Sequence, residues 1–115
     1  MIITRTPFRV SFAGGGSDIA SFYEKHEGCV LSTAINKYMY ISVHPSFSGK
    51  ETVLKYSKTE AVTDINQIEH KYFKKMLQIL DVKGVEIVST ADVPAGTGLG
   101  SSSSFTVGTL NALYA

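Results

Sequence analysis

The sequence predicts an α+β fold, with a mixed and largely antiparallel sheet that carries its helices on one face. Short runs rich in β-branched and aromatic residues alternate with polar or glycine-rich tips along much of the chain. Two other segments place apolar residues at steps of three and four, which is the helical period. No internal repeat or low-complexity linker divides the 115 residues, so we expect a single domain.

The first predicted unit is a strand, a glycine turn and a helix. Residues 2–13 are rich in strand-forming side chains and end at three consecutive glycines, which indicates a strand entering a tight turn. Pro7 favours an edge position for this strand, because proline cannot donate to a sheet ladder. Ser17 or Asp18 is then expected to cap a helix that closes near Gly28.

The middle of the chain predicts an antiparallel meander. Two β-prone runs, "CVLSTAI" and "YMYISVHP", are split by Asn36 and Lys37, and "TVLKYS" at residues 52–57 follows a polar tip. An amphipathic helix is expected from Ile65 onward, with lysines on its wet face. Its predicted inward positions are Ile68, Tyr72, Met76 and Leu80.

The last part of the chain predicts a strand, a glycine and serine junction, and a helix. The strand is "VEIVSTA" at residues 85–91, and the junction reads "DVPAGTGLGSSSS". After it, Phe105, Val107, Leu110 and Leu113 have helix-like spacing. The final "TLNALYA" carries no helix stop signal, so the chain is expected to be truncated within this helix.

Composition excludes some functions. The net charge is +1 and the eleven basic residues are dispersed, which argues against a nucleic-acid partner. The amino terminus lacks an export signal and no stretch suggests a membrane partner. The single cysteine, Cys29, cannot form an internal disulfide, so a reducing cytoplasm is expected, with Cys29 buried. The three histidines have no partner at zinc-ligand spacing, and His70 is assigned to an exposed helix face.

The junction has the chemistry of a phosphate site. Gly96, Gly98 and Gly100 allow positive φ angles and a close backbone approach, and the helix that follows exposes unpaired N–H groups. The serines can cap the helix, contact phosphate oxygen or offer an oxygen to Mg²⁺. Neither the lysine of a P-loop nor the G-x-G-x-x-G spacing is present. The alternative is a plain connection between a strand and a helix.

Two segments carry a resemblance to a known family. "PAGTGLGSSSS", residues 94–104, resembles the P-x-x-x-G-L-x-S-S motif of the GHMP kinases, named for galactokinase, homoserine kinase, mevalonate kinase and phosphomevalonate kinase. "TPFRVSFAGGGSD", residues 6–18, is similar to the family's amino-terminal strand and turn. The resemblance covers essentially the whole chain and implies the amino-terminal, ATP-binding domain over residues 1–115, with a ribosomal-protein-like β-α-β fold. It also implies that the catalytic aspartate and an acidic magnesium ligand lie beyond Ala115.

The resemblance implies an ATP-dependent sugar kinase that uses ATP and Mg²⁺. The most similar branch phosphorylates the anomeric hydroxyl of D-glycero-D-manno-heptose 7-phosphate. Arg9 is expected to be catalytic and Ser102 to bind Mg²⁺. The residues expected to bind the nucleotide are Pro94, Gly96, Gly98, Leu99, Gly100, Ser101, Ser102 and Ser103. Those expected to bind the sugar or sugar phosphate are Arg9, Gly15, Gly16, Ser17 and Asp18.

Other functions remain open at this point. The same loop fits a module that binds a phosphate-bearing ligand without catalysis, because the chain shows no general base or second metal ligand. A kinase for a fucose-like hexose or another small alcohol is a further alternative. A nucleic-acid-binding β-α-β domain is the weakest of them. The sequence assigns no oligomeric state.

Overall fold

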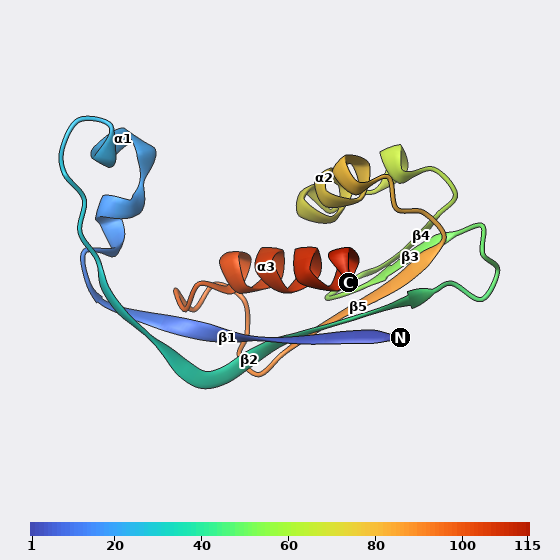
Figure 1. The fold of residues 1–115 in the computed structure, drawn as a ribbon, viewed down its shortest axis with the longest axis horizontal. Helices are drawn as coiled ribbons and strands as arrows, with labels where there is room; N and C mark the ends of the chain where they lie inside the picture. Colours follow the sequence, from blue (N-terminus) through green and yellow to red (C-terminus); the bar gives the residue numbers. More distant parts are fainter.

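The computed structural model describes all 115 residues and has the predicted architecture, an α+β fold with its helices on one face of a sheet. Figure 1 shows α2 and α3 above the sheet, whose opposite face no helix covers. The elements in chain order are β1 (Ile2–Ala13), η1 (Gly15–Asp18), α1 (Ala20–Tyr23), β2 (Leu31–Pro45), β3 (Thr52–Lys55), β4 (Thr59–Val62), η2 (Ile65–Gln67), α2 (Lys71–Leu80), β5 (Val85–Ala91) and α3 (Ser101–Tyr114).

The sheet is mixed and largely antiparallel, as expected, but its strand order is not that of a meander. The order is β1-β2-β5-β3-β4, and only the pairing of β3 with β5 is parallel. The meander prediction is wrong because β5, the last strand in chain order, inserts between β2 and β3. The edge position expected from Pro7 is confirmed, since β1 is an outer strand.

Asn36 and Lys37 do not separate two strands. They lie within β2, where the pairing with β1 changes register between Pro7 opposite Tyr38 and Arg9 opposite Ala34. The polar pair is therefore accommodated as an irregularity in one long strand. The short strand β4, which the sequence analysis did not anticipate, pairs with β3.

The first helix is shorter than expected. α1 has four residues, its N-cap is Ile19, and no side chain caps it. The expectation that Ser17 or Asp18 caps this helix is wrong, because both residues belong to the preceding η1 turn. The hydroxyl of Ser17 instead lies 2.7 Å from the Gly14 carbonyl oxygen and 2.9 Å from the Cys29 carbonyl oxygen.

The two longer helices pack with faces that differ in part from the prediction. The helix expected from Ile65 breaks after η2, and α2 then buries Phe73, Met76 and Leu77 against the sheet. Tyr72 was predicted to face inward, but it is exposed. In α3, Phe105 is buried as expected, whereas Val107 is exposed.

The core lies between the sheet and the two helices, and α3 is held against β1 by hydrogen bonds from side-chain hydroxyls to backbone carbonyls. Thr4 donates its hydroxyl hydrogen to the carbonyl oxygen of Gly108 at 2.8 Å, and Ser104 donates to the carbonyl oxygen of Pro7 at 2.9 Å. A side chain at Gly108 would lie 2.8 Å from the hydroxyl oxygen of Thr6. The start of α3 therefore has a defined position relative to β1. The buried apolar cluster comprises Phe8, Met39, Ile41, Val43, Leu54, Ile65, Ile68, Phe73, Met76, Leu77, Ile87, Phe105 and Ala112.

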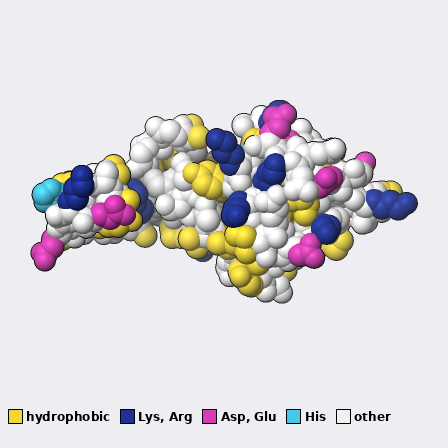
Figure 2. All heavy atoms as spheres, turned by 90° about the horizontal axis from the view of Figure 1, so that it is seen from above, with side chains coloured by type: hydrophobic (Ala, Val, Ile, Leu, Met, Phe, Trp, Pro, Cys, Tyr) yellow, Lys and Arg dark blue, Asp and Glu magenta, His cyan; other side chains and the backbone are white.

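Residues 14–30 form an arm that extends from the end of the sheet. Ser17 connects the beginning and the end of the arm. Its hydroxyl lies close to the carbonyl oxygens of Gly14 and Cys29, and the hydroxyl oxygen accepts a hydrogen bond from the amide of Cys29 at 3.1 Å. Figure 2 shows the arm as a narrow lobe at the left of the molecule, which measures 49 × 31 × 25 Å. No residue of the arm is buried, so the expected burial of Cys29 is wrong.

Candidate functional site

A loop of residues 92–100 connects β5 to α3 and contains three glycines with positive φ. The φ angles are 80° at Gly96, 72° at Gly98 and 73° at Gly100, which confirms the backbone conformation expected of this junction. Gly96 and Gly98 have open space where a side chain would begin. At these two positions the loop therefore presents backbone, and no side chain, to a group that approaches it.

The loop ends at the uncapped start of α3. Gly100 is the N-cap residue and no side chain accepts from the first turn, so of the three roles open to the serines the helix cap is not used. The first backbone hydrogen bond of the helix runs from the amide of Ser104 to the carbonyl oxygen of Gly100 at 3.0 Å. The amides of Ser101, Ser102 and Ser103 have no partner within the helix, and the helix dipole makes this end positive. Such an end binds anions, phosphate among them.

Arg9 lies directly against this loop. Its amide donates to the carbonyl oxygen of Leu99 at 3.1 Å, and its Nη1 lies 3.5 Å from the carbonyl oxygen of Gly98. A β-carbon at Gly100 would lie 3.2 Å from the guanidinium carbon. The structure thus places the arginine singled out in the amino-terminal segment beside the carboxy-terminal glycine loop, where its charge adds to that of the helix end.

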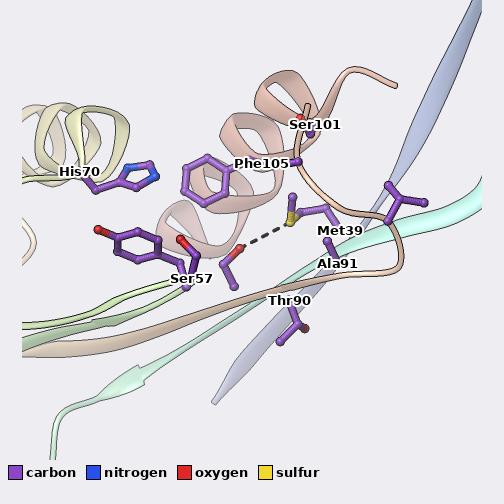
Figure 3. Close-up of a pocket in the computed structure, with 11 residues that line it drawn as sticks. Met39, Ser57, His70, Thr90, Ala91, Ser101 and Phe105 are labelled. Carbon is purple, nitrogen blue, oxygen red and sulfur yellow. Dashed lines mark hydrogen bonds between the residues drawn. The ribbon is translucent and has the colours of Figure 1, made fainter. Parts of the chain in front are cut away.

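A cavity of about 260 Å³ opens beside the start of α3. Figure 3 shows His70 and Phe105 side by side at this cavity, with Met39 and Ala91 on the sheet side and Ser101 at the start of the helix. A second cavity of about 170 Å³ shares part of this lining and also touches Ser102. The two spaces are smaller than a typical site for a whole drug-sized ligand. They suit one planar group of a ligand whose remaining part lies outside the cavity.

Aromatic side chains form the inner wall of the cavity. The rings of His70 and Phe105 have centroids 5.2 Å apart, and Tyr56 meets His70 edge to face at 4.7 Å. This wall was not predicted from the sequence, from which His70 was expected on an exposed helix face. In the structure His70 is half-buried and is the N-cap of α2, where its Nδ1 accepts a hydrogen bond from the amide of Phe73 at 3.4 Å.

Glu60 of β4 holds the segment that carries His70. Its buried carboxylate accepts from the hydroxyl of Tyr56 at 2.7 Å, from the amide of Glu69 at 2.7 Å and from the amide of His70 at 3.3 Å. Burial by itself raises the pKa of Glu60, but these hydrogen bonds together hold it below the ordinary value of 4.5. The hydrogen bond to Glu60 raises the pKa of Tyr56 to about 12.

Replacement of Glu60 by glutamine is expected to destabilise the protein at neutral pH. The amide has one acceptor oxygen, so partly buried donors lose their partner, at a cost of about 1–2 kcal/mol in the free energy of unfolding. Because the folded pKa lies below 4.5, the carboxylate stabilises the fold fully above that value and loses this effect as the pH falls through the folded pKa. Urea unfolding at pH 7 and at about pH 3.5 should therefore show a difference from wild type that shrinks in acid. A difference that does not change with pH would contradict this role.

The predicted sugar-binding residues other than Arg9 lie in the arm, apart from the cavity. Gly15, Gly16, Ser17 and Asp18 form the η1 turn. The Asp18 side chain is exposed and makes no hydrogen bond within the protein, so its carboxylate is free to accept from hydroxyl groups. The hydroxyl of Ser17, in contrast, already forms hydrogen bonds with Gly14 and Cys29, which connect the two ends of the arm.

Serine hydroxyl groups lie at the start of α3. No group of three or more His, Cys, Asp or Glu side chains is placed to hold a metal ion. Ser102 is exposed at the start of α3, and its hydroxyl makes no hydrogen bond within the protein. A hard cation that accompanies a phosphate at the helix end would find an available oxygen there.

None of the helices is both long enough and apolar enough to span a bilayer.

The chain matches the family model described as GHMP kinases N terminal domain over residues 58–115. A D-glycero-alpha-D-manno-heptose 7-phosphate kinase of Campylobacter jejuni is 30% identical over 96% of the chain. A D-glycero-D-manno-heptose 1-phosphate kinase from Bacteriodes thetaiotaomicron matches 97% of the chain with a TM-score of 0.82 and 25% identity. The mevalonate kinase of Methanococcus jannaschii shares the fold, with a TM-score of 0.72 and 24% identity over 97% of the chain.

The chain spans only part of each of these relatives. It covers 36% of the Campylobacter kinase, 40% of the Bacteriodes kinase and 39% of the mevalonate kinase. Three observations indicate the same family: the two sequence motifs, the mixed sheet with helices on one face, and the matched family model. The chain therefore belongs to the GHMP kinase family, whose amino-terminal domain it contains.

Proposed function

We propose that the intact protein is an ATP-dependent sugar kinase and that residues 94–103 hold the nucleotide phosphates. The observation that carries this proposal is the loop itself: three glycines with positive φ lead into a helix whose first amides have no partner. Phosphoryl transfer is catalysed mainly by positioning and by stabilising charge, and this loop supplies both through its backbone.

The cavity beside the loop suits the base of the same nucleotide. Phe105 and His70 offer flat faces, and Ser101 belongs both to the helix start and to the cavity lining. A base that packs here leaves its phosphates at the amides of α3, because one helix turn forms part of both surfaces. Aromatic rings pack favourably in offset or edge-to-face arrangements of this kind.

Arg9 and Ser102 complete the charge balance at the phosphates. Arg9 brings a guanidinium to the loop. The family resemblance implies a catalytic role for this residue. Ser102 would hold Mg²⁺ through its hydroxyl oxygen, and the ion would neutralise negative charge on the phosphates. This is the charge that a P-loop lysine partly offsets in other kinases.

For the acceptor we propose the anomeric hydroxyl of a heptose 7-phosphate, bound between the loop and the η1 turn. The relatives named for heptose phosphate support this acceptor class, and the exposed carboxylate of Asp18 matches the donors of a polyol. A fucose-like hexose is the next acceptor to test. We place the reaction in the cytoplasm, which the single cysteine favours.

The test is a titration of the intact protein with ATP, with and without Mg²⁺, followed by an assay of ADP release. D-glycero-D-manno-heptose 7-phosphate, fucose, galactose and mevalonate should be compared as acceptors. We expect Mg²⁺-dependent binding, and turnover that is highest with the heptose phosphate. Nucleotide binding without turnover on any acceptor would favour a binding module, and an absence of nucleotide binding would reject the kinase.

A further inference from the structure

A histidine in the cavity wall has one ring nitrogen committed to the fold and the other available. Nδ1 of His70 accepts from the amide of Phe73 and so caps α2. Nε2 makes no hydrogen bond within the protein and is not enclosed by it, although His70 is half-buried. Since His70 lines both cavity spaces, a group held there can reach the free nitrogen.

The cap decides which nitrogen carries the proton. An Nδ1 that accepts an N–H bond carries no hydrogen, so in the neutral ring the hydrogen lies on Nε2. Burial lowers the pKa of His70, against the opposing attraction of Glu60, and this favours the neutral ring. The cavity side of His70 is therefore a hydrogen-bond donor.

The surroundings keep this donor in place. Glu60 accepts from the amide of His70 at 3.3 Å, and the ring lies among Tyr56, Phe73 and Phe105, with centroids 4.7, 4.9 and 5.2 Å away. A ring packed on several sides and bonded through its other nitrogen has little freedom to turn. Donors held in this way select ligands by the acceptor that they require.

We propose that His70 reads the nucleotide base, by donating from Nε2 to an unprotonated ring nitrogen of a purine in the cavity. This inference rests on the proposed function, because it assigns specificity within the same site. His70 is then the residue that connects base selection to the cap of α2. The partner group is a ring nitrogen such as N1, N3 or N7 of adenine, which accept and do not donate.

Two substitutions separate the donor from the cap. Asparagine is a favoured N-cap residue, but its side chain is too short to replace Nε2 in the cavity, so His70→Asn should keep α2 capped and lose the donor. Glutamine carries an N–H group at about the reach of Nε2 but is not a favoured N-cap residue, so His70→Gln should keep much of the donor function and weaken the cap.

The experiment measures binding of ATP and of inorganic tripolyphosphate to the intact wild-type protein and to both variants. We expect His70→Asn to raise the Kd for ATP about tenfold, as for the loss of one well-placed hydrogen bond and ring contact, and to leave the Kd for tripolyphosphate unchanged. His70→Gln should raise the Kd for ATP by less than about threefold while its Tm falls more than that of His70→Asn.

Deaza analogues of ATP identify the accepting nitrogen. Among 1-deaza-, 3-deaza- and 7-deaza-ATP, one should bind wild type about tenfold more weakly than ATP and show no further loss with His70→Asn. Equal binding of ATP and all three analogues by wild type would overturn the proposal, and so would equal losses of ATP and tripolyphosphate with His70→Asn. Wild type that binds tripolyphosphate and ATP, with ATP binding unchanged in His70→Asn, rejects only the role of His70. Wild type that binds neither compound rejects the kinase function together with it.

Discussion

Replacement of Ser102 by alanine is expected to lower the rate of phosphoryl transfer about 100-fold, equivalent to about 2.7 kcal/mol in the activation free energy. The reason is that Ser102 offers the free hydroxyl oxygen at the proposed metal position, and the loop contains no lysine that could take over the charge. Stability should not fall, because the hydroxyl is exposed and bonded to nothing in the protein, and alanine is a good helix former.

Ser102→Thr is the matched control, because threonine keeps the hydroxyl at the same position. We expect this variant to recover most of the rate, and both variants to unfold at the wild-type temperature. The measurement is steady-state ADP release over a range of Mg²⁺ concentrations, where the alanine variant should also need more Mg²⁺ for half of its maximum rate. A fully active alanine variant with an unchanged Mg²⁺ requirement would show that Ser102 does not bind the metal.

Those parts of the fold that depend on local signals were predictable from the sequence. The strand β1 ends at three glycines, β5 begins after Gly84, and α3 follows the last glycine of the junction, so each has a boundary that the chain itself marks. The order of strands was not predictable in this way. β5 pairs with β2 on one side and with β3 on the other, and Ile87 is completely buried in this arrangement. These pairings join segments that are far apart in the sequence.

The candidate site likewise has one part that was predictable from the sequence and one part that was not. The positive φ angles of the glycine loop follow from residue type, so the backbone conformation of this loop was predictable from the sequence. The aromatic cavity was not visible, because Met39, Tyr56, His70 and Phe105 come from four separate segments that only the tertiary fold brings together. The α1 cap was misread because Ser17 forms hydrogen bonds across the arm in place of a helix cap.

The position of Arg9 shows why residue types alone did not predict the contacts of this side chain. Strict alternation along β1 would place Arg9 on the face opposite to the buried Phe8. The register shift after Pro7 interrupts this alternation, and the loop from residues 92–100 reaches the backbone of Arg9. Its contact with Gly100 therefore depends on an irregularity in the sheet that residue types alone do not specify.

Replacement of Gly100 by alanine is expected to lower the free energy of unfolding by about 2–3 kcal/mol. About 1–2 kcal/mol comes from placing alanine at a φ of 73°, and the remainder from the new β-carbon, 3.2 Å from the guanidinium carbon of Arg9. Gly98→Ala is the matched comparison, because its φ of 72° imposes the same strain while nothing lies within 4 Å of the added carbon. It should lose only about 1–2 kcal/mol.

A double-mutant cycle isolates the contact between Arg9 and the loop. Arg9→Ala removes the side chain against which the new carbon of Gly100→Ala would press. In the Arg9→Ala background, Gly100→Ala should therefore lower the free energy of unfolding only as much as Gly98→Ala lowers it in the wild type. Tripolyphosphate binding should weaken in both single glycine variants, and more in Gly100→Ala, because the N-cap of α3 and its first amides move together. Equal free energies of unfolding for the two glycine variants, or strictly additive effects in the cycle, would mean that the Arg9 side chain does not pack against Gly100. Coupling would show that the guanidinium supports the backbone that presents the amides, since only a side chain packed against Gly100 can respond to one added carbon.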